Sequence, residues 1–116
     1  LVGSEMCIRD SFDTIEKLIS WLFALHCLTP SDRLRLENSL CLIECNFPDN
    51  LRVRFPVLSE DDICIMLLLH IGISNVEIAR LLNILPSSFR MRRCRMKKKI
   101  GIAVEKLSDF ARMLRL

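Results

Sequence analysis

The strongest limit on the fold comes from helix start and stop signals that alternate between residues 59 and 101. Ser59 and Ser74 are each followed three residues later by an acid, which is the pattern of a capping box at a helix N-terminus. Pro86 suits the first turn of a third helix. Gly72 and Gly101 tolerate the positive φ at which helices often end. These signals predict three short helices, one after each start.

Composition favours an all-α fold for the whole chain. Apolar residues make up 51% of it, which excludes a disordered protein, and only 3 of the 116 residues are glycine, which disfavours a glycine-rich β fold. This length suits one compact domain, or a small domain with helical extensions. The longest mostly apolar stretch, from Leu18 to Leu28, is shorter than the roughly 20 residues that cross a bilayer. We therefore expect an all-α protein in the cytoplasm.

Two amphipathic helices are expected before the three described above. Ser11 or Asp13 can cap the first, whose apolar positions continue to Cys27. Ser31 can cap the second, which runs to about Asn46. In both segments the apolar residues recur at the spacing of a helix with one buried face.

The chain is expected to have four parts. Residues 1–11 resemble translated adaptor sequence, so we expect a non-native or disordered leader there. Two prolines within 48–56 indicate a short helical turn and a connector. The full division is the leader (1–11), a helical N-terminal extension (12–47), the connector (48–56) and a C-terminal domain (57–115) that ends with a further helix at about 103–114.

Positive charge is concentrated in the third of the capped helices. The chain has a net charge of +3, whereas residues 90–99 alone carry +7 and contain no acid, so the rest of the chain is net acidic. One basic stripe on a nearly neutral protein favours a polyanionic partner that meets a single surface.

The same helix has two distinct faces. At about 100° per residue, Phe89, Met96 and Ile100 fall on one side, which we expect to be buried. A solvated basic tail would not need such an apolar stripe. The opposite side carries polar and weakly apolar side chains with cations at its edges, which is what insertion into the major groove of duplex DNA requires.

Base contacts and phosphate contacts are assigned to different residues of this helix. Arg90 can read a guanine edge, and Met91 or Cys94 can touch a thymine methyl group. These three are the base-facing candidates. The residues expected to contact phosphates on this basis are Ser87, Arg93, Arg95, Lys97 and Lys98.

A longer pattern runs through all three capped helices. It reads Leu58-Ser59-x-x-Asp62, then Gly72-x-Ser74-Asn75-x-Glu77-Ile78-Ala79-x-x-Leu82-x-Ile84, then Pro86-x-Ser88-Phe89 and Lys99-Ile100-Gly101. This pattern resembles the LuxR (GerE-type) DNA-binding domain over residues 57–101. It is also similar to the C-terminal module of bacterial regulators in which this domain follows tetratricopeptide repeats.

The resemblance implies a four-helix domain with a helix-turn-helix, whose third helix enters the major groove and whose fourth commonly dimerises. It places Arg90, Met91 and Cys94 at base-facing positions and adds Ser88 as a phosphate contact. The implied partners are double-stranded DNA and a second copy of the chain, joined through the C-terminal helix or the N-terminal extension. Related regulators often have a membrane helix before this module, so the full-length protein can be membrane-anchored upstream.

Three positions depart from the family pattern. Leu85 stands where a Ser or Thr usually caps the recognition helix, at a typical cost of about 1 kcal/mol. Arg92 replaces a His or small residue that faces the interior, so its stem should pack while its charge reaches solvent. Asp61 replaces a basic residue. These departures affect the DNA contacts more than the fold.

The sequence does not indicate an enzyme. His26 and His70 have no nucleophile or acid arranged beside them, and the three glycines cannot form a phosphate loop. The six cysteines contain no C-x-x-C pair, so we expect reduced core thiols rather than a zinc site, for which His26, Cys41 and Cys45 are the nearest candidates. We expect no catalytic residue, no metal, no cofactor and no small-molecule substrate.

The sequence therefore predicts sequence-specific binding of duplex DNA by a bacterial transcription regulator, with a recognition helix at about 86–100. Two other functions fit the same pattern. One is a helical protein-interaction module, in which 12–47 and the last helix bind another protein and the basic helix meets an acidic surface. The other is the sigma-factor region that reads the −35 promoter element, which shares the helix-turn-helix.

Overall fold

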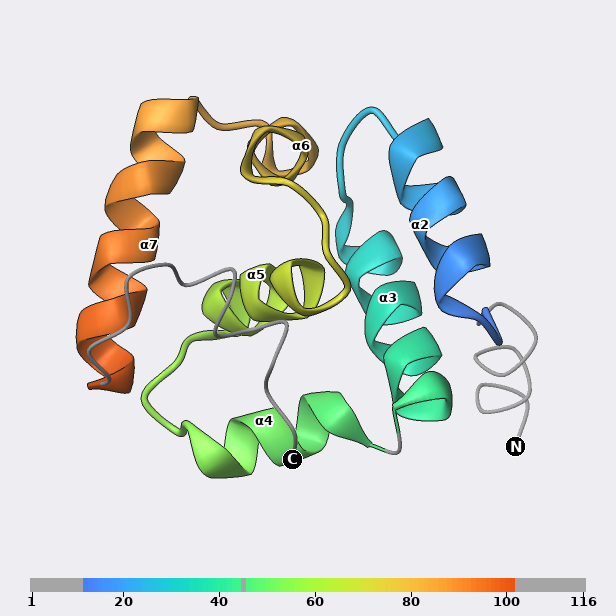
Figure 1. Ribbon diagram of the computed structural model, residues 1–116, viewed down its shortest axis with the longest axis horizontal. Helices are drawn as coiled ribbons and strands as arrows, with labels where there is room; N and C mark the ends of the chain where they lie inside the picture. The colour runs from blue at the N-terminus through green and yellow to red at the C-terminus, as the bar shows by residue number, and fades with distance from the viewer. Residues whose placement is uncertain (1–11, 45, 102–116) are drawn as a thin grey trace.

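All the regular structure in the described part of the chain is helical, and this part comprises residues 12–44 and 46–101 of the computed structural model (Figure 1). The expected all-α class is confirmed for these residues. The leader at 1–11 and the helix expected at about 103–114 lie outside them. The helices are α2 (Ile15–Ala24), α3 (Pro30–Ile43), α4 (Phe47–Arg54), α5 (Glu60–His70), α6 (Asn75–Leu82) and α7 (Pro86–Ile100).

Helix α5 lies at the centre of the fold (Figure 1), and α3, α4 and α6 pack against it. Every residue from Asp62 to Leu69 is buried. A helix that is apolar on almost every side belongs inside a core, because each side needs a neighbour that excludes water. Helix α5 is therefore the element around which the other helices are positioned.

The hydrophobic core is continuous from α2 to α7. Buried side chains from every helix form one cluster, which includes Leu18 of α2 at one end and Met96 of α7 at the other. The loop after α2 is also bonded to α6, since the backbone N–H of Leu28 donates to the carbonyl of Leu81 over 2.7 Å. The core and this hydrogen bond join the segment 12–47 directly to the helices that follow residue 57.

The first two helices begin at residues other than the predicted caps. Thr14, and not Asp13, caps α2 by accepting a hydrogen bond from the backbone N–H of Lys17, and this helix ends at Ala24 rather than near Cys27; Ser11 lies outside the described residues. Thr29, and not Ser31, caps α3. Its hydroxyl accepts from the N–H of Asp32 over 3.2 Å, and the Asp32 carboxylate accepts from the N–H of Thr29 over 3.0 Å. The prediction missed this reciprocal capping box, which Pro30 suits because proline fits the first helical turn.

The segment expected to be a short helical turn and a connector forms a regular helix of eight residues, α4. It begins at Phe47, whose side chain is buried together with that of Pro48. Proline in the first turn removes a donor that has no helical partner there, so it starts a helix rather than breaking one. None of the helices in residues 12–44 and 46–101 is long and apolar enough to span a membrane.

The predicted start and stop signals of α5, α6 and α7 largely agree with the structure. Ser59 caps α5 in a reciprocal box with Asp62. Ser74 caps α6 by accepting from the N–H of Glu77, but the predicted return bond is wrong, because the Glu77 carboxylate instead pairs with Arg80 over 2.7 Å. Helix α7 ends, as predicted, at Gly101, where φ is +74°.

Candidate nucleic-acid interface

Helix α7 follows α6 after only three residues, Asn83 to Leu85. Asn83 adopts the left-handed conformation (φ 56°) that ends α6 and turns the chain. Leu85 occupies the N-cap of α7 and makes no side-chain capping bond, as its apolar side chain requires. The pair of helices is thus joined by a tight turn, and the N-terminus of the second helix remains uncapped by a side chain.

One edge of α7 is anchored in the core. Phe89 is 1% exposed and Met96 is fully buried, while Ile100 is half-buried and packs against the same cluster. The predicted buried edge is therefore confirmed for Phe89 and Met96, and in part for Ile100. Because these side chains are held from one side only, the opposite face of the helix is turned away from the core.

The three base-facing candidates, Arg90, Met91 and Cys94, are all exposed. Met91, a large apolar side chain, is 59% exposed. The contacts of these residues with DNA stay a prediction. Of the candidates for phosphate contact, four are exposed (Ser87, Ser88, Arg95 and Lys98) and two are half-buried (Arg93 and Lys97).

Cations lie along both sides of this exposed face at the same spacing, i, i+3 and i+7, which places each set on one side of a helix. The α6 flank is defined as Arg90, Arg93 and Lys97. The α5 flank is defined as Arg92, Arg95 and Lys99.

The α6 flank borders a groove of about 320 Å³ between the start of α6 and the first turns of α7. Arg93 stacks over the ring of Phe89, with 5.2 Å between its Cζ atom and the ring centroid. The groove is lined by Asn75, Val76, Pro86, Ser87, Phe89, Arg90 and Arg93.

Two buried polar atoms in this groove, Asn75 Oδ1 and Arg93 Nε, have no hydrogen-bond partner within the described residues. Unpartnered buried polar groups are uncommon. Arg93 Nε is a donor and suits an anion, whereas Asn75 Oδ1 is an acceptor and needs a donor. Asn75 is the first residue of α6, where free backbone N–H groups favour an anion. The sequence predicts no role for Asn75. The residue appears there only as one position of the LuxR-like pattern, and nothing in its local sequence points to a binding site.

The α5 flank faces two acids at the N-terminus of α5. Lys99 Nζ lies 2.8 Å from Asp62 Oδ2, and Arg92 Nε lies 3.6 Å from Asp62 Oδ1. Arg92 Nη2 also donates to Asp61 Oδ2 over 3.4 Å. The Arg92 side chain keeps 37% of its surface exposed, as predicted, but the prediction missed that its guanidinium also pairs with both acids.

The Asp62 carboxylate is almost completely enclosed, with 3% of its side chain exposed. Burial raises the pKa of this carboxyl, but the hydrogen bonds from Lys99 and Ser59 outweigh that effect and lower the pKa overall. Asp62 therefore stays ionised at neutral pH, and it both caps α5 and holds the last turn of α7.

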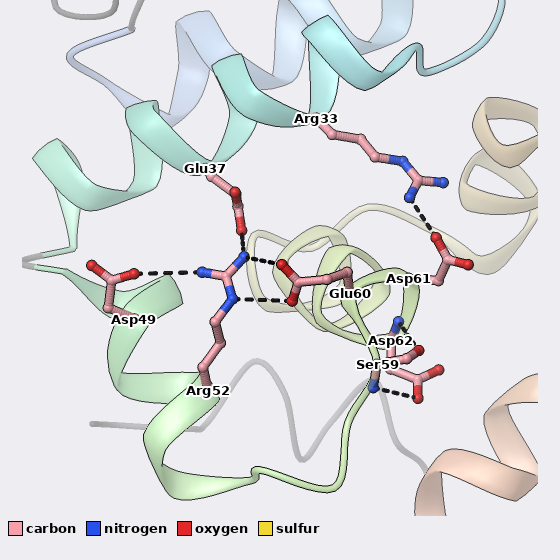
Figure 2. A network of polar contacts seen from close by, with 8 residues as sticks. All are labelled: Arg33, Glu37, Asp49, Arg52, Ser59, Glu60, Asp61 and Asp62. Atoms are coloured by element: carbon pink, nitrogen blue, oxygen red, sulfur yellow. Dashed lines mark hydrogen bonds and ion pairs between the residues drawn. The ribbon is translucent and has the colours of Figure 1, made fainter. Parts of the chain in front are cut away.

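Asp61 connects α7 to a helix far away in the sequence. Its Oδ1 accepts a hydrogen bond from Arg33 Nη1 of α3 over 2.5 Å, and this contact spans 28 residues (Figure 2). The bond from Arg33 lowers the pKa of the Asp61 carboxyl, and the same bond raises the pKa of Arg33. One carboxylate is thus shared by guanidinium groups of α3 and α7.

A second ionic network surrounds Arg52 of α4 (Figure 2). Its Nε and Nη2 atoms each lie 3.1 Å from Glu60 of α5, and the guanidinium also pairs with Glu37 of α3 and Asp49 of α4. The hydrogen bond to Glu60 raises the pKa of Arg52. This network ties α3, α4 and α5 together without contacting α7 within the described residues.

Residues 12–44 and 46–101 contain no group of three or more His, Cys, Asp or Glu side chains placed to hold a metal ion. Of the nearest metal candidates, Cys41 is a free thiol, His26 is exposed and Cys45 lies outside the described residues. Burial raises the pKa of the Cys64 thiol to about 11, as for an inert core cysteine.

Comparison of the chain with protein-family models, with curated proteins and with solved structures finds no match. The resemblance to the LuxR domain therefore stays a prediction from the sequence pattern. The geometry of α6 and α7 is the feature of the chain that bears on its function.

Proposed function

We propose that this chain binds duplex DNA in a sequence-specific manner, as the DNA-binding part of a bacterial transcription regulator. Helices α6 and α7 act as a helix-turn-helix, and α7 enters the major groove as the recognition helix. The observation that carries the proposal is the two-sided character of α7. Phe89 and Met96 hold it from behind, while Arg90, Met91 and Cys94 project from the other face.

Two flanks of cations suit a helix lying in a groove with a phosphate strand on each side. The groove beside the α6 flank offers Arg93 and the first-turn N–H groups of α6 that Ser74 does not cap to one of these strands. Such contacts orient the protein without reading sequence. Sequence is then read by Arg90 on a guanine edge and by Met91 or Cys94 on a thymine methyl group.

A second copy of the chain is part of the proposal, because helix-turn-helix proteins commonly bind paired half-sites as dimers. One predicted dimer surface, the C-terminal helix, lies outside the described residues. The other is the N-terminal extension, where Phe23 of α2 is 54% exposed. Sedimentation with and without a selected DNA site distinguishes one bound copy from two.

The first test measures binding of the chain to a random-sequence duplex by gel retardation at low salt. Retardation that weakens steeply with added salt is the expected result, because bound cations release counterions from the phosphates. No retardation even at low salt would favour the protein-interaction module. Selection of bound oligonucleotides then separates an operator-binding regulator from a sigma-like domain, which would recover promoter-like sites and need core polymerase.

The second test replaces Arg90, the residue proposed to read a base. We expect Arg90→Ala to relax the preference at one base pair by about 1–3 kcal/mol, measured on single-base variants of a selected site. Lys98→Ala is the control, since loss of a phosphate contact should weaken binding to every variant equally. A uniform loss with Arg90→Ala would contradict its base-reading role.

A further inference from the structure

We infer that Asp61 is a positioning residue through which α3 controls how much of the Arg92 charge is available to DNA. This inference rests on the proposed function of α7. It adds a role for the N-terminal extension, since Arg33 of that segment holds one side of the same carboxylate.

The geometry divides the Asp61 carboxylate between two partners. Oδ1 lies 2.5 Å from Arg33 Nη1, and Oδ2 lies 3.4 Å from Arg92 Nη2. Arg33 is the closer of the two and is the main cause of the lowered Asp61 pKa. Because one negative charge serves two guanidinium groups, a stronger bond to one weakens the other.

The contacts are adjustable because all three side chains are partly solvated. Asp61 is 50% exposed, and Arg33 and Arg92 are 35% and 37% exposed. The neighbouring Asp62 differs, since it is enclosed and bonded to both Ser59 and Lys99, and its Oδ1 lies 3.6 Å from Arg92 Nε whichever way Asp61 leans. Asp62 is a structural acid, whereas Asp61 can shift between its two partners at little cost to the fold.

The division of the Asp61 carboxylate between Arg33 and Arg92 predicts in which direction each substitution changes the affinity for DNA. Arg92 held by Asp61 is less able to pair with a phosphate, and the carboxylate itself repels phosphates. Arg33 reduces both effects by drawing Asp61 toward α3. Loss of Asp61 should therefore strengthen DNA binding, and loss of Arg33 should weaken it.

The experiment measures the dissociation constant and its salt dependence on one duplex by fluorescence anisotropy, using the full chain. Asp61→Asn should tighten binding by roughly two- to five-fold at low salt, the range of an exposed ion pair, and steepen the log–log salt slope by up to about one. Asp49→Asn is the matched control, because Asp49 is also an acid in a helix first turn paired with an arginine, Arg52. This control should change binding less.

A double-mutant cycle separates coupling from a simple loss of charge. Arg33→Gln should weaken binding more than Arg54→Gln, which removes an equal charge from α4. In the Asp61→Asn background this excess should vanish, because the shared carboxylate is absent. Thermal unfolding of each variant verifies that the chain folds.

Three results would overturn the inference. They are equal effects of Asp61→Asn and Asp49→Asn, equal effects of Arg33→Gln and Arg54→Gln, or an unchanged excess from Arg33→Gln in the Asp61→Asn background. If the unmodified chain binds no DNA, the proposed function fails and the inference fails with it. If the chain binds DNA and the variants behave as their controls, only the inference fails.

Discussion

The two flanks of α7 have the same sequence spacing but different surroundings. Each has three cations at i, i+3 and i+7. On the α5 flank, Arg92 and Lys99 are paired with acids at the start of α5. On the α6 flank, Arg93 stacks on Phe89, and neither Arg90 nor Arg93 forms an ion pair within the described residues. The number of cations in a basic helix therefore overstates the charge that it offers to DNA, because neighbouring helices neutralise part of it.

The largest expected effect comes from removing the anchor beneath both flanks. Phe89→Ala should reduce the free energy of unfolding by about 3–5 kcal/mol, because it deletes a fully buried aromatic ring and leaves a cavity. Urea unfolding measures this loss. Met91→Ala, on the exposed face of the same helix, should change stability by less than about 0.5 kcal/mol. Similar losses for the two variants would contradict the docking of α7 by its Phe89 edge.

The comparison between flanks is tested most directly by single cations. Arg93→Ala should reduce the log–log salt slope of DNA binding by about 0.9, the value for one lost phosphate contact, and Arg92→Ala should reduce it by less. Replacing Arg93, Lys97 and Lys98 together should weaken binding to every sequence. Equal reductions of the salt slope by Arg92→Ala and Arg93→Ala would show that the acids of α5 do not lower the contribution of Arg92 to DNA binding.

The acid that fixes the α5 flank should also give the fold a pH dependence. The folded-state pKa of Asp62 lies below 3.8, its ordinary value, so its contribution to stability is complete well above pH 4 and is lost as the pH falls through the folded pKa. Asp62→Asn should reduce stability at pH 7 by about 1–2 kcal/mol through the cap and the Lys99 bond.

Urea unfolding at pH 7 and in acid tests the role of Asp62. The stability of Asp62→Asn should fall less steeply in acid than that of the unmodified chain. Asp13→Asn, at an exposed pair with Lys17, is the control and should leave the acid profile nearly unchanged. A profile for Asp62→Asn that parallels the unmodified chain would rule out this role.

The smallest expected effect is a gain at the start of α7. Leu85 has the extended φ and ψ that an N-cap needs, but it is 69% exposed and offers no capping oxygen. Leu85→Ser should stabilise the fold by about 1 kcal/mol by accepting a hydrogen bond from a first-turn N–H. Thermal unfolding measures the gain, and Leu85→Ala should not reproduce it.

Sequence signals that act within one turn predicted most of α5, α6 and α7. Ser59, Ser74 and Gly101 act through bonds to residues a few positions away, so their effect is visible in a short stretch of sequence. The buried edge at Phe89 and Met96 followed from helical spacing in the same way. Local signals also misled at the start of α3, where Ser31 and Thr29 are both plausible caps. Thr29 is the actual cap, because Asp32 three residues later completes a capping box with it.

Contacts between distant residues could not be predicted from one sequence. The spacing of Arg33 and Asp61 gives no sign that they touch, and the partners of Arg92 depend on how the fold brings the start of α5 within reach of α7. The groove between Asn75 and Arg93 likewise depends on how α6 and α7 are oriented. For this reason the sequence predicted which residues face outward, but not which of their charges are already neutralised.

The burial of α5 on almost every side has a practical consequence for any shortened version of the chain. A fragment starting at residue 57 would lack α3 and α4, and the leucine-rich sides of α5 that they cover would meet water. Such a fragment should aggregate, although it contains the whole of α6 and α7. A shortened chain that keeps α6 and α7 folded therefore has to retain the helices that precede residue 57.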